Sequence, residues 1–435
     1  MHAHIRRRTG ELEQGIIECR RDLHKYPETG WTEFRTASMT IKKLASLGYV
    51  IKMGEETNRP GDMRGVPHKD ILASCRQRAV SQGGDPGLIS VMADGLTGFT
   101  ADMTFGGDGP KVGCRVDMDA NDITEAGDAS HRPFREGFSS VNRGVMHACG
   151  HDAHVAIGIG VAGVIASLKD RLKGSLRLIF QPAEEGVRGA KAMVGAGVTR
   201  GINFLLGSHI SFQASRSGML ICGAKGFLAS TKWDVAFTGE SAHAGAAPQN
   251  GRNALLAACV ASLNLHAISR HADGATRINV GRLSAGEGRN TIPAKALLAM
   301  ETRGLTTELD GYMLQEAGRI VEAAAGMYGC SYDVDVVGGS ISGESDAEMV
   351  DMVAEAAKGI PFYDEVIRMR EFGGGEDFSY MLKDVQEQGG QGTYIQVGAD
   401  RTAGHHNEKF DLDEAGLAPA VELLSRSIVS LLTRP

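Results

Sequence analysis

The stretch Ser175-Leu-Arg-Leu-Ile-Phe180, followed by Gln181-Pro-Ala-Glu-Glu-Gly186, indicates the architecture of this chain. The first part is a short apolar run, typical of a buried strand, and the second is a polar segment bent by proline. The runs Lys111–Val116 and Phe204–Gly207 have the same form, and a helix is expected from about His154 to Leu172. Strands that alternate with helices predict an α/β fold: a mixed, mostly parallel sheet flanked by helices.

The order of the expected elements changes between about residues 228 and 337. Strand, helix, strand, strand, helix and strand are expected there in turn, over Thr231–Phe237, Asn253–Arg270, Thr276–Leu283, Ala296–Thr302, Asp310–Met327 and Cys330–Val337. This βαββαβ order is that of a small two-layer sandwich. We therefore expect a domain over residues 225–338 inserted in one that covers 1–224 and 339–435.

The first domain is expected to begin with two helices within residues 12–47. From about residue 52 to 102 the pattern loosens and is punctuated by Gly and Pro, which favours an insertion packed on the surface. Within it, Asp70–Ser81 is a candidate for one amphipathic helix.

Composition excludes several classes of function. The chain has 435 residues and a net charge of −7, so no basic excess indicates binding to nucleic acid or to an anionic membrane. No run reaches the ~18 apolar residues of a membrane span, and no apolar core follows the charged N-terminus, so no secretory signal is expected. Seven widely spaced cysteines, an odd number, favour reduced thiols and a cytoplasmic location.

The strongest chemical signal is Met146-His-Ala-Cys-Gly-His-Asp-Ala-His154, a loop that precedes a buried helix. Cys149 and His151 carry a thiolate and an imidazole, which are good ligands for first-row divalent metals. The alternative is a helix N-terminus capped by Asp152 beside a buried cysteine. Taken alone, the motif leaves both interpretations open.

Further polar side chains follow other expected strands. Glu184 and Glu185 lie on a bent loop, where one carboxylate can bind a metal while the other holds a water, although such a pair is usually a solvated surface. His209 follows a strand as either a ligand or a core histidine. Asp117 and Asp119 follow another, and alone are more typical of a solvated turn.

The adjacent histidines His405 and His406 lie on a polar loop near the C-terminus. In parallel sheets the ligand site lies beyond the carboxyl ends of the strands. Together the candidates place Cys, His, Glu and Asp around one such edge, which is the arrangement that a co-catalytic metal pair requires.

Several stretches resemble the motifs of one family: Arg20–Glu28, His147–His154, Pro182–Glu185, Ser241–Pro248 and Gly375–Tyr380. They are similar to those of the aminoacylase and carboxypeptidase-G group of dinuclear metallo-amidohydrolases, in the branch with hippurate hydrolase and indole-acetyl-amino-acid hydrolases. The resemblance covers nearly the whole chain. It implies a zinc-peptidase-like fold with an inserted lid or dimerisation domain, and hydrolysis of the amide bond between an acyl group and an amino acid.

Within this branch, Ser130–Phe138, Gly288–Pro293 and Gly404–Asp411 resemble members that hydrolyse p-aminobenzoyl-glutamate to p-aminobenzoate and glutamate. That substrate is therefore expected. A broader N-acyl-amino-acid hydrolase would use the same metal site. A third alternative, a non-catalytic subunit of a heteromeric hydrolase, is disfavoured because Glu184 and every expected ligand are retained.

The resemblance also implies the role of each site residue. The ligands of two divalent metals would be Cys149, which lies between them, with His151, Glu185, His209 and His406. Glu184 would be the general base and Asp119 would orient the metal site, while His243 would enter the active site of a partner protomer, and Asn290 with Arg303 would clamp the substrate carboxylate. Manganese is favoured and zinc is possible. The expected assembly is a homodimer or a hetero-oligomer with a homologous subunit.

Overall fold

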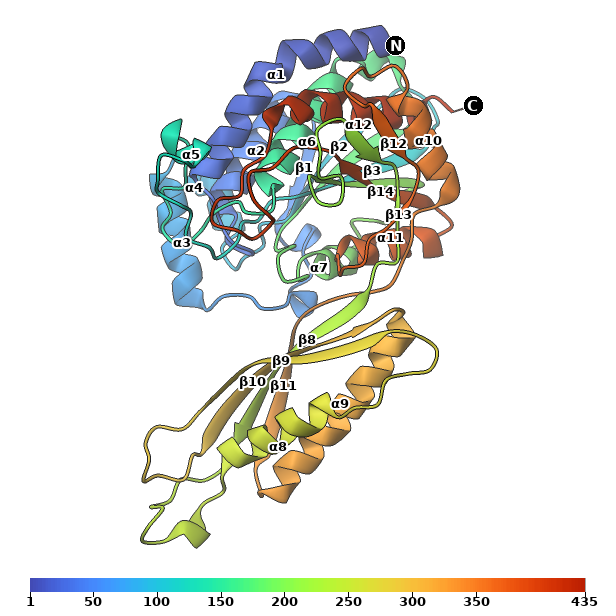
Figure 1. Ribbon diagram of the computed structural model, residues 1–435. Coiled ribbons are helices and arrows are strands. Elements are labelled where there is room, and N and C mark those ends of the chain that lie inside the picture. Colours follow the sequence, from blue (N-terminus) through green and yellow to red (C-terminus); the bar gives the residue numbers. More distant parts are fainter. Residues whose placement is uncertain (435) are drawn as a thin grey trace. The chain divides into compact units, whose positions relative to one another are not determined.

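The computed structural model describes residues 1–434, which form two compact units (Figure 1). The first contains residues 1–225, 344–372 and the chain from Asp377 onward. The second contains Gly226–Gly343 and Gly373–Glu376.

The first unit is built on an eight-stranded sheet. Its strands, in spatial order, are β1 (Val50–Met53), β2 (Phe99–Thr104), β4 (Ser175–Gln181), β3 (Lys111–Asp117), β5 (Phe204–Ile210), β14 (Gln391–Val397), β6 (Met219–Ile221) and β12 (Glu365–Ile367). The central strands β4, β3, β5 and β14 are parallel to one another, whereas β1, β2 and β6 each pair antiparallel with a neighbour. The predicted mixed, mostly parallel sheet is confirmed.

Helices cover both faces of this sheet (Figure 1). One face carries α1 (His2–Lys25), α2 (Phe34–Ser46), α6 (His151–Ala166) and α12 (Leu417–Leu432). The other carries α7 (Ala190–Gly195) and α11 (Phe378–Glu387). Further elements of this unit are α3 (Lys69–Ser81), α4 (Pro86–Val91), α5 (Arg132–Arg135), α10 (Ala347–Ala357), and the paired strands β7 (Ala224–Lys225) and β13 (Arg370–Glu371).

Helix α6 lies against the centre of the sheet because its glycines allow close approach. A Cβ added at Gly158 would lie 2.8 Å from Val116 Cγ2 on β3, and one at Gly160, on the side that faces α12, would lie 2.7 Å from Val421 Cγ2. Among the described residues, one helix, Glu414–Leu432, has the length and composition of a membrane span. Its apolar window is 78% buried inside the protein, as in the core helix of a globular domain.

The stretch 52–102 differs from the expected surface insertion at both ends. Its middle contains α3, where a helix was a candidate, and α4. However, β1 and β2 pair with each other, and β2 pairs with β4, so they extend the main sheet at its edge. These strands are short, and β2 follows directly on Gly98, so their local pattern did not distinguish them from a loop.

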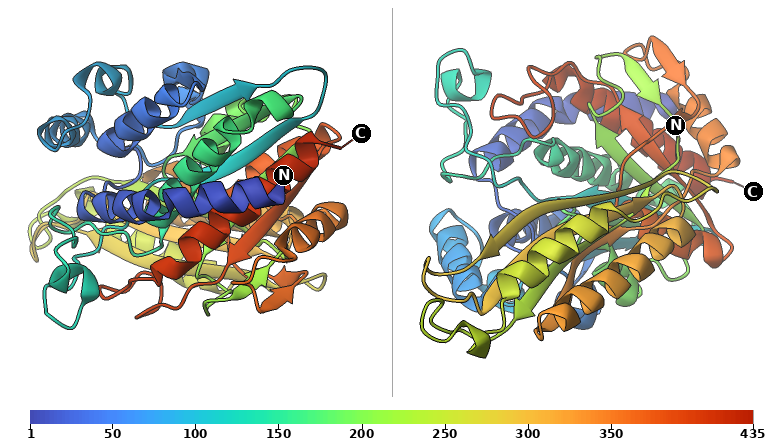
Figure 2. Two further views of the ribbon diagram at one scale, coloured as in Figure 1. Left: turned by 90° about the horizontal axis from the view of Figure 1, so that it is seen from above. Right: turned by 60° about the horizontal axis from the view of Figure 1, so that its bottom comes forward.

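The second unit has the predicted βαββαβ order: β8 (Ala229–Thr238), α8 (Ala254–His266), β9 (Thr276–Ala285), β10 (Lys295–Gly304), α9 (Thr307–Met327) and β11 (Ser331–Ser340). Its sheet has the order β11-β8-β10-β9, with antiparallel neighbours throughout. Both helices pack on one face (Figure 2). Their first turns are capped by Asn253 and Thr306, whose side chains accept hydrogen bonds from Leu256 N and Leu309 N.

Candidate metal centre and active site

The expected site residues of the first unit follow the ends of its parallel strands. Asp119 follows β3, Glu184 and Glu185 follow β4, His209 is near the end of β5, and His406 follows β14. Because parallel strands end at the same edge, their polar side chains converge there. Helix α6 begins at this edge with His151, after Gly150 at φ 89°.

Buried carboxylates hold the backbone of the glutamate loop. Asp119 accepts hydrogen bonds from Glu184 N and Glu185 N, each 2.9 Å long, with its two carboxylate oxygens. Glu33 accepts a 2.8 Å hydrogen bond from Ala183 N. Ala183 has φ 49°, a conformation that costs a non-glycine residue free energy, so these hydrogen bonds must maintain it.

Asp377, from the expected Gly375–Tyr380 motif, holds the far end of the same loop. Its Oδ2 accepts hydrogen bonds from Gly189 N and Ala190 N, at 3.0 and 2.9 Å. Its Oδ1 accepts one from Gln181 Nε2 at 2.7 Å. The loop that carries the glutamates is therefore fixed from end to end.

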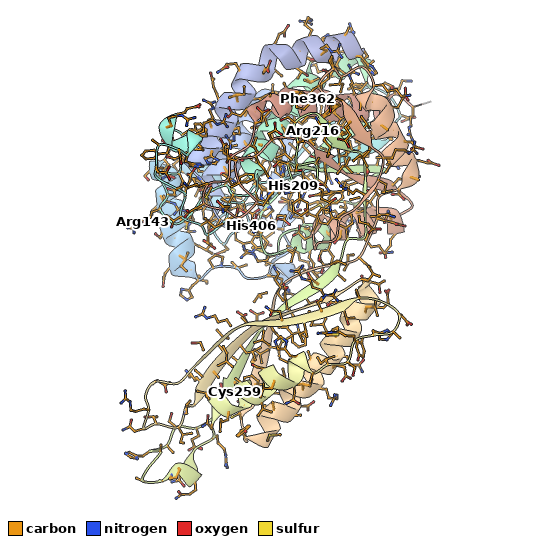
Figure 3. The ribbon with its side chains drawn as sticks, viewed as in Figure 1. Arg143, His209, Arg216, Cys259, Phe362 and His406 are labelled. Atoms are coloured by element: carbon orange, nitrogen blue, oxygen red, sulfur yellow. The ribbon has the colours of Figure 1, made fainter. Side chains whose placement is uncertain are left out.

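Cys149 lies at the centre of the site. Its Sγ is 3.4 Å from His209 Nε2, and the donor atoms of Cys149, His151 and His209 all lie within 4.8 Å of one another. The same holds for Cys149, Glu185 and His406. Figure 3 labels His209 and His406 within the first unit. The two donor groups share only the sulfur, which is the pattern of two ions bridged by one ligand.

The two buried histidines present the same nitrogen to this centre. His151 Nδ1 is 2.9 Å from the carbonyl oxygen of Asp119, and His209 Nδ1 is 2.8 Å from that of Ile210. A carbonyl oxygen only accepts, so each Nδ1 carries a proton and Nε2 is available as a ligand. His151 Nε2 is buried without a hydrogen-bond partner, and buried Glu185 Oε1 has only an ion-pair contact with His406 Nε2, as expected of atoms that coordinate a cation.

The charges around the centre also suit a cation. Burial alone would lower the pKa of His151, but the charge of the Asp117 carboxylate raises it well above its ordinary value, so a metal ion bound at Nε2 would displace a proton there. Burial lowers the pKa of His209 far below its ordinary value, so this ring is neutral. Burial and the charge of Glu185 raise the pKa of the Cys149 thiol, so metal binding would release its proton.

His154 is buried beside this site but both its ring nitrogens are engaged. Nδ1 bonds to Asp117 Oδ1, and Nε2 accepts a 2.9 Å hydrogen bond from Ile210 N. Asp117 is also paired with Arg115, which neutralises it. Asp117, His151 and His154 also lie close enough to form a donor group, as do two sets that contain Glu184, but these bonds assign Asp117 and His154 to support of the sheet edge.

The adjacent histidines His405 and His406 were both candidates from the sequence, and the family resemblance implied a ligand role only for His406. The structure brings both rings to the centre. His405 Nε2 bonds to Ser211 O at 3.0 Å, so the lone pair of Nδ1 faces Cys149 Sγ, 3.4 Å away. His406 Nε2 is 3.4 Å from Glu185 Oε1, and His406 has φ 60°.

The stretches Ser130–Phe138 and Gly404–Asp411 are bound to each other. Arg132 pairs with Asp411 at 2.5 Å and donates a 2.9 Å hydrogen bond to Leu412 O. Lys409 pairs with Asp128 at 3.2 Å. These contacts tie the loop that carries His406 to the segment around α5.

The remaining expected residues lie in the second unit. His243 and Asn290 are on adjacent loops: Ala244 N donates a 2.9 Å hydrogen bond to Asn290 O. Arg303 is near the far end of β10, about 25 Å from its start, and pairs with Glu301 at 2.9 Å. Within this unit, Asn290 and Arg303 are therefore not brought together.

The fold and this donor set are those of a metallohydrolase, and comparison with known proteins defines the family. Residues 113–430 match Peptidase family M20/M25/M40, and the chain belongs to it. Its members include hydrolases of peptide and other amide bonds, so the expected resemblance is confirmed.

The chain is similar along its length to several named proteins. It is 44% identical to indole-3-acetyl-aspartic acid hydrolase of Enterobacter agglomerans, over 95% of both chains. It is 43% identical to one of the subunits of p-aminobenzoyl-glutamate hydrolase of Escherichia coli, over 96% of both. The crystal structure of an aminobenzoyl-glutamate utilization protein from Klebsiella pneumoniae superimposes with a TM-score of 0.85, at 35% identity and 98% coverage of both chains.

Proposed function

We propose that this protein is a metal-dependent amidohydrolase that cleaves an aromatic acyl group from an acidic amino acid, with p-aminobenzoyl-glutamate as the favoured substrate. The observation that carries the proposal is the pair of donor groups that share Cys149, with Glu184 beside them. The names of two relatives support the substrate class, since both combine an aromatic acyl group with aspartate or glutamate.

The donors fit two divalent cations, one held by Cys149, His151 and His209 and the other by Cys149, Glu185 and His406. When bound, such ions polarise the amide carbonyl and lower the pKa of a water molecule. The thiolate suits zinc, whereas the carboxylate and imidazoles also suit manganese, which the family resemblance favours.

Glu184 is the proposed general base. Its side chain is 13% exposed, and its Oε2 is 3.9 Å from His151 Nε2, so its carboxylate borders the donor groups without completing either of the two. In this role it takes a proton from the attacking water and delivers it to the leaving nitrogen. Asp119 positions it by holding the backbone of both glutamates.

His243 is proposed to act in the active site of a second protomer. Its Nδ1 accepts hydrogen bonds from Gly245 N and Ala246 N, at 3.1 and 3.0 Å, so the proton is on Nε2. The ring is exposed and offers this N–H as a donor for the oxyanion of the tetrahedral intermediate.

Two further residues would bind the substrate carboxylates. Asn290, next to His243, would reach them from the same partner protomer. Arg303, which the family resemblance pairs with Asn290 as the carboxylate clamp, has a planar fork suited to a carboxylate. The partner is a second copy or a homologous chain, since one relative is named as part of a hydrolase with more than one kind of subunit.

A cytoplasmic location is proposed from the seven unpaired cysteines.

The test is hydrolysis of p-aminobenzoyl-glutamate, indole-3-acetyl-aspartate and hippurate by the purified protein, loaded with manganese or with zinc. Glu184→Gln should retain near-normal metal content while its activity falls by roughly 100-fold or more. Cys149→Ser should lose metal affinity. Hippurate cleaved better than both acidic substrates would favour the broader N-acyl-amino-acid hydrolase. No hydrolysis of any of the three would favour a non-catalytic subunit.

A further inference from the structure

An aromatic side chain that the proposed chemistry does not use lies beside the metal centre. Phe212 follows β5, and its ring centroid is 5.6 Å from that of His209 and 5.5 Å from that of His405. The facing nitrogen of each of these histidines is 3.4 Å from Cys149 Sγ. The rings of His209 and His405 therefore contact both Cys149 and Phe212.

Phe212 is the accessible member of a group of aromatic rings. Phe372 is 5.2 Å from it, Tyr394 is 5.7 Å from Phe372, and Phe410 is 4.9 Å from His405, all between ring centroids. Phe372, Tyr394 and Phe410 are buried, whereas Phe212 is only half-buried. Of these four side chains, Phe212 is therefore the one that leaves ring surface for a ligand to contact.

The backbone around Phe212 is held in place. Ser211 has φ 60°, an unfavourable conformation for a non-glycine residue. Arg401 NH1 donates hydrogen bonds to Ser211 O and Phe212 O, at 2.5 and 3.0 Å. The Gln213 side chain donates to Phe372 O at 2.7 Å, which joins the segments of the two phenylalanines. Phe212 is thus a rigid, preorganised surface.

The chemistry of an aroyl amide fits this position. Its ring is bonded directly to the carbonyl carbon that is attacked, so it must lie beside the metal centre. Aromatic rings pair favourably at centroid separations of about 4.5–7 Å. An aliphatic acyl group would bury apolar area on Phe212 but would not gain this ring pairing.

We propose that Phe212 is the binding surface for the aromatic ring of the acyl group and selects aromatic over aliphatic acyl-amino acids. This inference rests on the proposed amide hydrolysis and assigns its acyl specificity to one side chain.

The experiment compares p-aminobenzoyl-glutamate with N-hexanoyl-glutamate, which has the same amino acid and an apolar acyl group without a ring. For Phe212→Leu, kcat/KM for the aromatic substrate should fall roughly 3- to 10-fold, the scale of one aromatic pair, with less than a 2-fold change for the hexanoyl substrate. Phe212→Tyr, which keeps the ring, should keep the wild-type selectivity. If a substrate is not cleaved, its inhibition constant against the other replaces kcat/KM.

The control is Phe362→Leu. Phe362, which Figure 3 labels, lies in the first unit. It is also half-buried, and its ring centroid is 5.5 Å from that of Tyr363. Its loss should leave selectivity unchanged. Equal losses on both substrates in Phe212→Leu, or no loss on either, would overturn the assignment. A wild-type protein that cleaves no aromatic acyl-amino acid would instead refute the proposed function.

Discussion

Asp119 is predicted to control metal affinity without binding the metal. Its side chain is 1% exposed, and both its oxygens accept backbone hydrogen bonds from the glutamate loop. In Asp119→Asn, one oxygen is replaced by an NH₂ group that faces a backbone N–H, so two donors oppose each other. One charge-assisted hydrogen bond is lost and one buried N–H is left without an acceptor, which costs about 1.5–3 kcal/mol.

Part of this free-energy cost should appear as weaker metal binding, because Glu185 is a proposed metal ligand and lies on the glutamate loop, which would shift in Asp119→Asn. Substitutions of groups that orient metal ligands typically lower affinity by about 10- to 100-fold, and we expect a loss in this range. Competition with a chromophoric chelator measures it, and circular dichroism confirms folding. Asp122→Asn is the matched control, since Asp122 is close by in sequence but exposed. Metal affinity in Asp119→Asn within 2-fold of wild type would refute the reasoning.

Three further predictions concern pH, the loop that carries His406, and assembly. Burial and Arg20 lower the pKa of His24, but hydrogen bonds to Asp152 and Glu125 raise it to about 9 from an ordinary 6.5. Because the pKa of His24 is higher in the folded than in the unfolded protein, protonated His24 stabilises the fold at pH values below its unfolded pKa. His24→Gln should therefore lower the free energy of unfolding in urea by up to about 3 kcal/mol at pH 6, and by progressively less as pH rises through 9. A loss that does not change with pH would contradict this. Arg132→Met should weaken metal binding roughly 10-fold, unlike Arg135→Met, whose side chain is 54% exposed; equal effects would argue against a specific tie to that loop. Mixed His243→Ala and Glu184→Gln proteins should regain part of the activity that each lacks, because one mixed site holds both intact residues; no recovery after confirmed exchange of protomers would mean that His243 acts within its own chain, or not at all.

The sequence predicted most of the central architecture because the responsible signals are local. The apolar runs at β3, β4 and β5 and the glycine-rich helix α6 each have a period or composition that identifies them without tertiary contacts. The same holds for the βαββαβ order of the second unit. At the edge of the main sheet the prediction from local sequence signals was wrong, because β1 and β2 are short and are defined by pairing with strands distant in sequence.

For the candidate site too, some features were predictable from the sequence and others are seen only in the folded chain. The residue types Cys149, His151, Glu184 and Glu185 were evident from the sequence, since their motifs carry them. Only the folded chain brought the imidazole of His405 against Cys149 and engaged both nitrogens of His154. Which nitrogen of a histidine is available depends on the acceptor that the other one meets, and a sequence does not contain that information.

The sequence by itself therefore determined the class of fold and the inventory of chemical groups at the strand ends. The tertiary structure alone decided which carboxylates hold backbone, as Asp119 and Asp377 do, and which remain available to a cation, as Glu185 Oε1 does. It also placed the ring of Phe212 beside His209 and His405. The physical reason is that hydrogen bonds and ring contacts join segments separated by up to hundreds of residues, so partners are chosen only when the strands assemble.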